Sequence, residues 1–120
     1  MITGGYAGIG YHLTHLLYAK HATIYLAGRS EDKARAAIAK LEAACPQSKG
    51  RLAFLYLDLA DLTTIKPSVD AFLAKESRLD VLVNNAAVMV PPTGSAYLPI
   101  QLTSSEPGAL YRILWYHFVF

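Results

Sequence analysis

Short, continuously apolar segments alternate with amphipathic segments through the first 90 residues, and this alternation constrains the fold more than any other feature. The apolar segments, which have the length and composition of buried strands, are residues 22–27, 52–57 and 81–83. The segments with helical spacing of apolar residues are 9–20, 31–44 and 64–75. Strands that are apolar on both faces and separated by helices form a parallel sheet covered on both sides, so we predict an α/β fold.

Local signals support the helices. Ser30 can cap the segment 31–44, Glu31 and Arg35 have the spacing of an i,i+4 ion pair, and Pro46 ends the segment. In the segment 31–44, one helix face is expected to carry Ala34, Ile38, Leu41 and Cys45. In the segment 64–75, the side chains expected to point inward are Ile65, Val69, Phe72 and Leu73.

The predicted sheet is an incomplete, doubly wound Rossmann-like sheet. Only Met1 and Ile2 precede the first turn, so the first strand is expected to be shortened, and the strands after the fourth are expected to be missing. The alternation stops near Pro91-Pro92, which predicts a partial nucleotide-binding domain over 1–92 and an irregular apolar tail over 93–120. An open sheet edge would favour self-association.

Composition excludes several classes of protein. With 53% hydrophobic and 17% charged residues, the 120-residue chain is too apolar for intrinsic disorder. A net charge of +2 gives no electrostatic reason to expect nucleic-acid binding. No segment reaches the length needed to span a membrane, and a single cysteine fits a reducing, cytoplasmic location. His12 and His15 lack a third ligand, so no metal site is expected.

A glycine-rich turn, Thr3-Gly4-Gly5-Tyr6-Ala7-Gly8-Ile9-Gly10, lies directly before the first expected helix. The start of a helix offers unpaired backbone N–H groups and a positive dipole end, which together favour a phosphate. Side chains at Gly4 or Gly8 would block the turn or the approach of the phosphate, and Gly10 allows close packing of helix and sheet. The alternative is an ordinary glycine-rich loop.

The spacing T-G-x-x-x-G-I-G resembles the cofactor-binding turn of the short-chain dehydrogenase/reductase family. This resemblance implies an NAD(P) cofactor whose diphosphate lies on the turn. The residues it assigns to the cofactor in this turn are Gly4, Tyr6, Ala7, Gly8, Ile9 and Gly10.

Two further positions carry the resemblance toward the adenosine half of the cofactor. An NAD site usually has an acidic residue about 20 residues after the glycines, but Gly28 stands there and Arg29 follows, so we predict NADP(H) rather than NAD(H). Arg29 could instead only solvate the end of a strand. The resemblance implies that Asp58 and the backbone N–H of Leu59 bind adenine, whereas a plain loop acid or helix cap is the alternative for Asp58.

The third apolar run leads into Asn84-Asn85-Ala86-Ala87, which matches three of the four positions of the family's N-N-A-G motif. In the family these residues brace the sheet and touch the adenosine ribose, which implies such roles for Asn84, Asn85 and Ala86. Ala87 replaces the motif's glycine and would matter if that position needs a positive φ. The run into Val88 and Met89 is most similar to the retinol-dehydrogenase-like branch.

The chain carries no match to the family's catalytic Y-x-x-x-K motif, because none of Tyr18, Tyr97, Tyr111 or Tyr116 is followed by lysine four positions later. We assign no catalytic residue. The resemblance implies NADP(H)-dependent oxidation of an alcohol or reduction of a carbonyl, here reduced to the cofactor-binding part and inactive alone. The alternatives are a non-enzymatic nucleotide-binding or interaction module, and a non-functional fragment.

Overall fold

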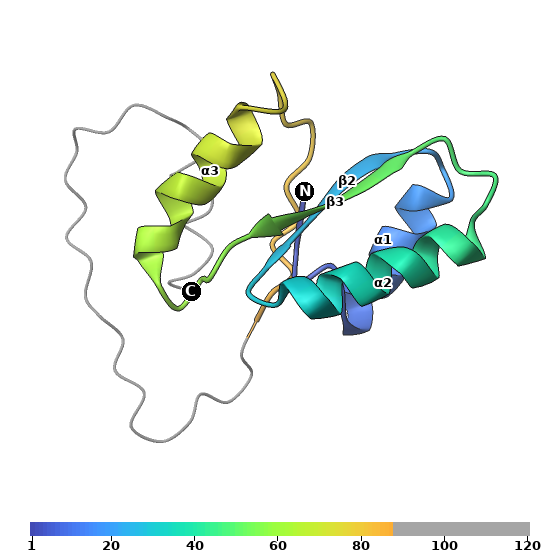
Figure 1. Cartoon of the computed structure of the whole chain (residues 1–120), viewed down its shortest axis with the longest axis horizontal. Coiled ribbons are helices and arrows are strands. Elements are labelled where there is room, and N and C mark those ends of the chain that lie inside the picture. Colours follow the sequence, from blue (N-terminus) through green and yellow to red (C-terminus); the bar gives the residue numbers. More distant parts are fainter. Residues whose placement is uncertain (88–120) are drawn as a thin grey trace.

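The computed structural model describes residues 1–87, which form a small parallel sheet with helices on both faces (Figure 1). The strands are β1 (Ile2–Thr3), β2 (Thr23–Gly28) and β3 (Arg51–Tyr56). The helices are α1 (Gly8–Tyr18), α2 (Glu31–Ala44), the 3₁₀ helix η1 (Leu62–Thr64) and α3 (Ile65–Leu73). Every element expected over residues 9–75 is therefore present, and the segment 31–44 is a helix over its whole predicted length.

The sheet order is β1-β2-β3, and both pairs are parallel. Thr23 of β2 pairs with Arg51 of β3, and the register continues to Gly28 and Tyr56. On its other side β1 meets the segment around Val83 through one parallel bridge from Ile2. The spatial order of the chain is thus third, second, first and fourth segment, which is the beginning of the doubly wound dinucleotide-binding order. The predicted fold class is confirmed.

The fourth strand is shorter than the sequence predicted. Residues 81–83 were expected to form a strand, but only Val83 takes part, through its bridge to Ile2. The Val83 N–H donates to the Met1 carbonyl at 2.9 Å, and the Thr3 N–H donates to the Val83 carbonyl at 3.0 Å. Because β1 has two residues, it offers too little backbone for a longer ladder. The shortened first strand was predicted and its consequence appears here.

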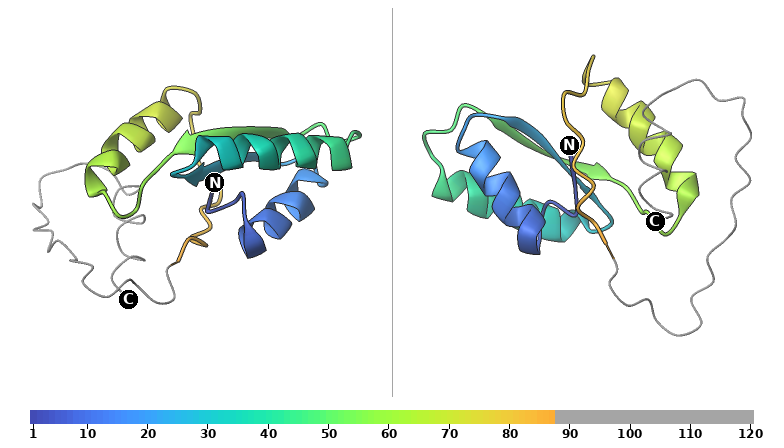
Figure 2. Two further views of the ribbon diagram at one scale, coloured as in Figure 1. Left: turned by 60° about the horizontal axis from the view of Figure 1, so that its bottom comes forward. Right: turned by 180° about the vertical axis from the view of Figure 1, so that it is seen from behind.

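Alternate residues of β2 face opposite layers, which places α1 and α2 on one side of the sheet and α3 on the other (Figure 2). Tyr25 and Ala27 are buried with side chains of β3 and α3. Ile24 and Leu26 are buried with Ile2, Tyr18 of α1 and Leu41 of α2, in a cluster that we call the α1/α2 core. Both faces of the sheet are therefore covered, as the continuous apolar strands predicted.

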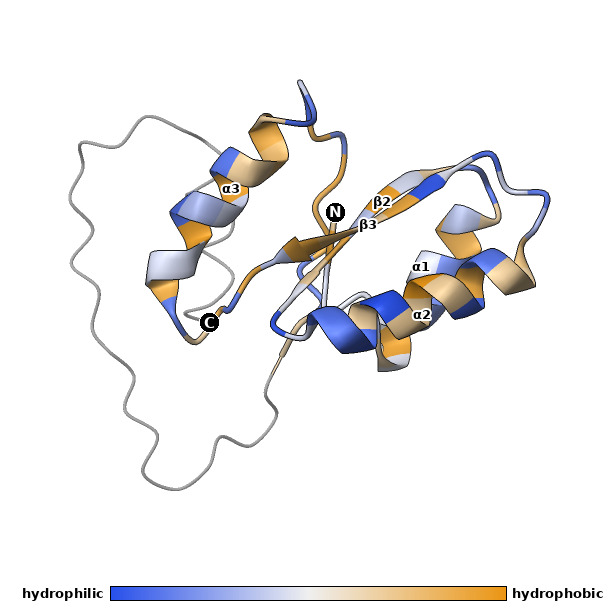
Figure 3. Ribbon diagram, in the orientation of Figure 1, coloured by the Kyte–Doolittle hydropathy of each residue, from blue (hydrophilic) through white to orange (hydrophobic). Residues whose placement is uncertain are grey.

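The start of α2 follows its sequence signals. The Lys33 N–H donates to Ser30 Oγ at 3.4 Å, and Arg35 Nε donates to Glu31 Oε1 at 2.9 Å, so the predicted cap and ion pair are both confirmed. Hydrophilic colour marks this helix start in Figure 3, while the strands beside it are mostly apolar. Ala34 and Leu41 are buried, and Ile38 and Cys45 pack against the α1/α2 core.

Several apolar side chains remain exposed. Leu73 was expected to point inward but is 53% exposed, because α3 ends there and Phe72 fills the contact with the sheet. On α1 the buried residues are Gly10, Thr14 and Tyr18, whereas Ile9 and Leu16 are 81% and 65% exposed. Part of the apolar repeat of this helix therefore faces away from the described sheet, although Leu13 packs against the α1/α2 core. The predictions for 93–120, and with them the domain boundary at 92, lie outside the described residues.

Candidate functional site

The glycine-rich turn leaves the carboxyl end of β1 and enters α1. Gly4 and Gly8 have φ angles of +65° and +52°, in the region that side-chain-bearing residues rarely adopt. Among residues 1–87, nothing lies within 4 Å of a Cβ atom added to Gly8, so the described part of the chain leaves the space above this residue open. The turn thus has the backbone conformation that its glycines predicted, and it leaves room for a ligand at the start of α1.

The beginning of α1 lacks the features that normally satisfy a helix start. Ala7 occupies the N-cap position without a side-chain hydrogen bond, and no acidic residue lies in the first turn. By contrast, α2 has the Ser30 cap and Glu31 and Asp32 in its first turn. The first backbone N–H groups and the positive dipole end of α1 therefore stay available for an anion.

Asn85, in the fourth segment, holds the turn by hydrogen bonds. Its backbone N–H and that of Ala86 both donate to Thr3 Oγ1 at 3.0 Å, and Asn85 Nδ2 donates to the Thr3 carbonyl at 3.0 Å. Glycine at position 10 leaves space for the Asn85 side chain, because a Cβ atom there would lie 2.5 Å from Asn85 Nδ2 and 2.5 Å from the Gly4 oxygen. The turn, the start of α1 and the N-N-A segment therefore form one braced unit.

Position 87, where the family motif has glycine, does not require glycine in this structure. Among residues 1–87, His21 is the one non-glycine residue with a positive φ. Ala87 therefore lacks the positive φ that would favour glycine, and the hydrogen bonds between Asn85 and Thr3 are present with alanine at position 87.

Arg29 and Asp58 meet beyond the carboxyl ends of β2 and β3. Arg29 Nε lies 4.0 Å from Asp58 Oδ1, and the two side chains are 70% and 22% exposed. Asp58 Oδ1 also accepts the Ala60 N–H at 2.9 Å, so this carboxylate orders its own loop. A pair at this distance with one exposed partner adds little stability, and the Arg29 guanidinium stays accessible to a ligand.

The remaining predicted site residues occupy the same edge of the sheet with less specific contacts. The Leu59 side chain packs against the core on the α3 side of the sheet, Ala86 is exposed, and Ile9 projects from the first turn of α1. All predicted residues therefore lie at the carboxyl ends of the parallel strands, where open α/β sheets bind ligands.

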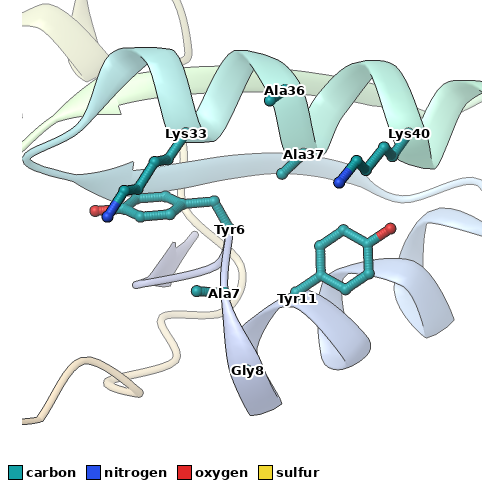
Figure 4. A pocket seen from close by; sticks show the side chains of 8 residues that line it. All are labelled: Tyr6, Ala7, Gly8, Tyr11, Lys33, Ala36, Ala37 and Lys40. Atoms are coloured by element: carbon teal, nitrogen blue, oxygen red, sulfur yellow. The ribbon is translucent and has the colours of Figure 1, made fainter.

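Tyr6 is the residue whose position the sequence did not reveal. Its ring lies against Gly28 at the end of β2, and together with Lys33 and Lys40 it lines a cavity of about 450 Å³ between α1 and α2 (Figure 4). The other lining residues are Ala7, Gly8, Tyr11, Ala36 and Ala37. Of the residues that the structure describes, no carboxylate lines this cavity, and the two charged groups that do are lysines. The only sequence signal was the glycine at position 28, where an acid was expected.

Three titratable groups with shifted pKa values, Tyr25, Arg51 and Glu76, lie toward the opposite, amino-terminal end of β2 and β3. The Tyr25 hydroxyl donates to Glu76 Oε1 at 2.8 Å, and Arg51 pairs with the same carboxylate. Burial and this hydrogen bond raise the pKa of Tyr25, and the bond from Tyr25 lowers the pKa of Glu76. Tyr25 packs edge-on against Phe72 at 5.0 Å, so the network ties α3 to the sheet and lies away from the glycine turn.

Two negative findings concern residues 1–87 alone. In this range no cluster of three or more histidine, cysteine, aspartate or glutamate residues could bind a metal ion. No helix in the same range has the length and apolar character that crossing a membrane requires.

Comparison with known proteins identifies the family. The profile described as short chain dehydrogenase matches residues 1–102. A "Short-chain dehydrogenase/reductase" of Phomopsis amygdali is 55% identical over 91 residues, which is 76% of this chain and 27% of that protein. The chain belongs to the short-chain dehydrogenase/reductase family, and it spans less than a third of the length of this relative. The match does not distinguish branches, so the retinol-dehydrogenase-like branch stays a prediction.

Solved structures of the family share this fold. Menthone neomenthol reductase from Mentha piperita aligns with a TM-score of 0.66 and 31% identity, over 72% of this chain and 31% of that chain. An NADPH-bound short chain oxidoreductase from Pseudomonas aeruginosa PAO1, described as having an atypical catalytic center, aligns with a TM-score of 0.62 and 27% identity, over 72% of this chain and 34% of that one. The described residues are therefore the first part of a dinucleotide-binding Rossmann fold.

Proposed function

We propose that this chain binds NADP(H) on the glycine-rich turn and forms the cofactor-binding part of an alcohol dehydrogenase or carbonyl reductase. The observation that carries the proposal is the uncapped start of α1 behind the open space at Gly8. Backbone N–H groups at a helix start, backed by the dipole, are suited to a diphosphate. The family membership and an NADPH-bound neighbour support the same cofactor class.

Each predicted residue receives one role in this proposal. The amides of Gly8, Ile9 and Gly10 bind the diphosphate, and Gly4, Tyr6 and Ala7 shape the turn in front of them. Arg29, exposed at the tip of β2, pairs with the 2′-phosphate. The residues that face the adenosine are Asp58 and Leu59 for adenine and Asn85 and Ala86 for the ribose.

The chain's own residues bind and orient the cofactor, which supplies the hydride chemistry of the reaction. General acid–base catalysis in the family uses a tyrosine with a nearby lysine, and none of the four tyrosines considered above matches that motif. We therefore expect the 120-residue chain to bind NADPH without turnover. A purely nucleotide-binding module is the second candidate.

A titration of the full chain with NADPH and NADH tests the binding proposal. NADPH should bind more tightly, and Arg29→Ala should weaken NADPH binding about tenfold while leaving NADH binding nearly unchanged, because a charge-assisted contact to the 2′-phosphate is lost. Arg35→Ala is the matched control, since Arg35 is a similarly exposed arginine that pairs with Glu31 on α2. Equal losses in both variants, or tighter binding of NADH, would contradict the role of Arg29.

A turnover assay separates binding from activity. The purified chain should show no steady consumption of NADPH with carbonyl substrates, although it binds the cofactor. Sustained consumption would show that residues outside the Y-x-x-x-K pattern supply the acid–base step. The cytoplasmic location and the self-association predicted from the sequence belong to this proposal as well.

A further inference from the structure

The end of β2 carries a steric constraint that the family resemblance does not explain. A Cβ atom added to Gly28 would lie 2.4 Å from Tyr6 Cε1 and 2.5 Å from the Tyr6 hydroxyl oxygen. Real Cβ atoms do not approach other atoms this closely, so any side chain at position 28 requires the Tyr6 ring to move. The two residues are distant in the sequence, but the ring fills the space above the strand tip.

Tyr6 is held in this position by its surroundings. Its side chain is partly buried and packs against the α1/α2 core. Its backbone lies between Gly4 and Gly8, whose positive φ angles set the path of the turn. The same ring lines the cavity between α1 and α2 together with Tyr11, Lys33 and Lys40 (Figure 4), so it contacts both the strand tip and this cavity.

Position 28 is where an acidic side chain would bind the ribose 2′-hydroxyl of NAD(H). We propose that Tyr6 is a specificity-determining residue, because its ring occupies the space over Gly28 that such an acid would need. The turn itself then keeps an NAD-type acid out of position 28, whereas Arg29 contacts the 2′-phosphate. This inference rests on the proposed binding of NADP(H).

A set of three variants of the full chain tests the coupling: Gly28→Asp alone, Gly28→Asp with Tyr6→Ala, and Gly28→Asp with Tyr11→Ala. The single variant should lose thermal stability and gain no NADH affinity, since its carboxylate has no room. Adding Tyr6→Ala should recover stability and raise the NADH-to-NADPH affinity ratio about tenfold, the effect of one hydrogen bond to a charged group. Tyr11 lines the same cavity from α1 and serves as the matched aromatic control.

Two results would overturn the role of Tyr6. The first is a gain in NADH affinity from Gly28→Asp alone, and the second is equal recovery with Tyr11→Ala. If the aspartate variants do not fold, Gly28→Ala with and without Tyr6→Ala provides the same comparison through melting temperature, and absence of recovery by Tyr6→Ala refutes the contact. If the wild-type chain binds neither dinucleotide, the proposed function and this inference are refuted together. If it binds NADPH but Tyr6→Ala does not change the effect of Gly28→Asp, this inference alone is refuted.

Discussion

Replacing Gly10 by alanine sets helix propensity against packing, and the structure decides which effect is larger. Gly10 lies inside α1 and is buried. In an exposed helix, alanine is about 1 kcal/mol more favourable than glycine, so propensity alone predicts a more stable protein. Here the added Cβ atom would lie 2.5 Å from the Gly4 carbonyl oxygen and 2.5 Å from Asn85 Nδ2.

The two collisions are not equally easy to relieve. The Asn85 amide can rotate away, which sacrifices its hydrogen bond to the Thr3 carbonyl at a cost of about 1 kcal/mol. The Gly4 oxygen belongs to the backbone and can retreat only if the turn separates from α1. Overpacking of this kind costs about 1–3 kcal/mol, so we expect Gly10→Ala to lower the free energy of unfolding by a similar amount despite its better propensity.

Urea denaturation followed by far-UV circular dichroism measures this cost. Gly8→Ala is the matched control, because it strains a φ of +52° but its Cβ atom meets none of residues 1–87 within 4 Å. In an Asn85→Ala background the cost of Gly10→Ala should fall, while that of Gly8→Ala should stay the same. A Gly10→Ala chain as stable as the wild type would refute the close packing of the turn against α1.

Three other predictions concern stability and association. Hydrogen bonding from Tyr25 lowers the pKa of Glu76 in the folded chain. The Glu76 carboxylate therefore stabilises the fold above its pKa in the unfolded chain, and this stabilisation is lost as the pH falls through its pKa in the folded chain. Glu76→Gln should lower the urea midpoint at neutral pH and make the midpoint fall less steeply in acid, and an acid profile equal to that of the wild type would refute this role of Glu76. Replacing Leu41, which is 0% exposed, by alanine should lower the free energy of unfolding by about 2–5 kcal/mol in urea denaturation. A smaller loss would contradict the tight packing of this side chain. Leu16→Glu, at a position 65% exposed, should reduce self-association in light scattering and change the urea midpoint little; an unchanged mass would exclude this face of α1.

Sequence patterns predicted the elements best where local chemistry defines their ends. The helix α2 matches its predicted bounds because Ser30 caps its start and Pro46 follows its end. The segment 81–83 failed as a strand because strand formation depends on the length of the neighbouring strand, and the consequence of a two-residue β1 was not carried over to this segment. Helical spacing likewise located α1 but did not reveal that Ile9 faces away from the sheet.

The candidate site divides in the same way. The glycine turn was recognisable because positive φ angles at Gly4 and Gly8 demand glycine, and that requirement is local. The contact of Tyr6 with Gly28 joins distant parts of the chain, and a glycine in a sequence does not show which atom excludes its Cβ. Asn85 was assigned to the ribose, and the structure adds the hydrogen bonds by which it holds the turn.

The most direct test of the account is an amide NMR titration of the full chain with NADPH. Binding of the diphosphate by the turn predicts that the largest shifts fall on the backbone amides of Gly8, Ile9 and Gly10, with smaller shifts around Arg29. A saturable response confined to α3, or no response in the turn at concentrations where NADPH binds, would contradict the central claim.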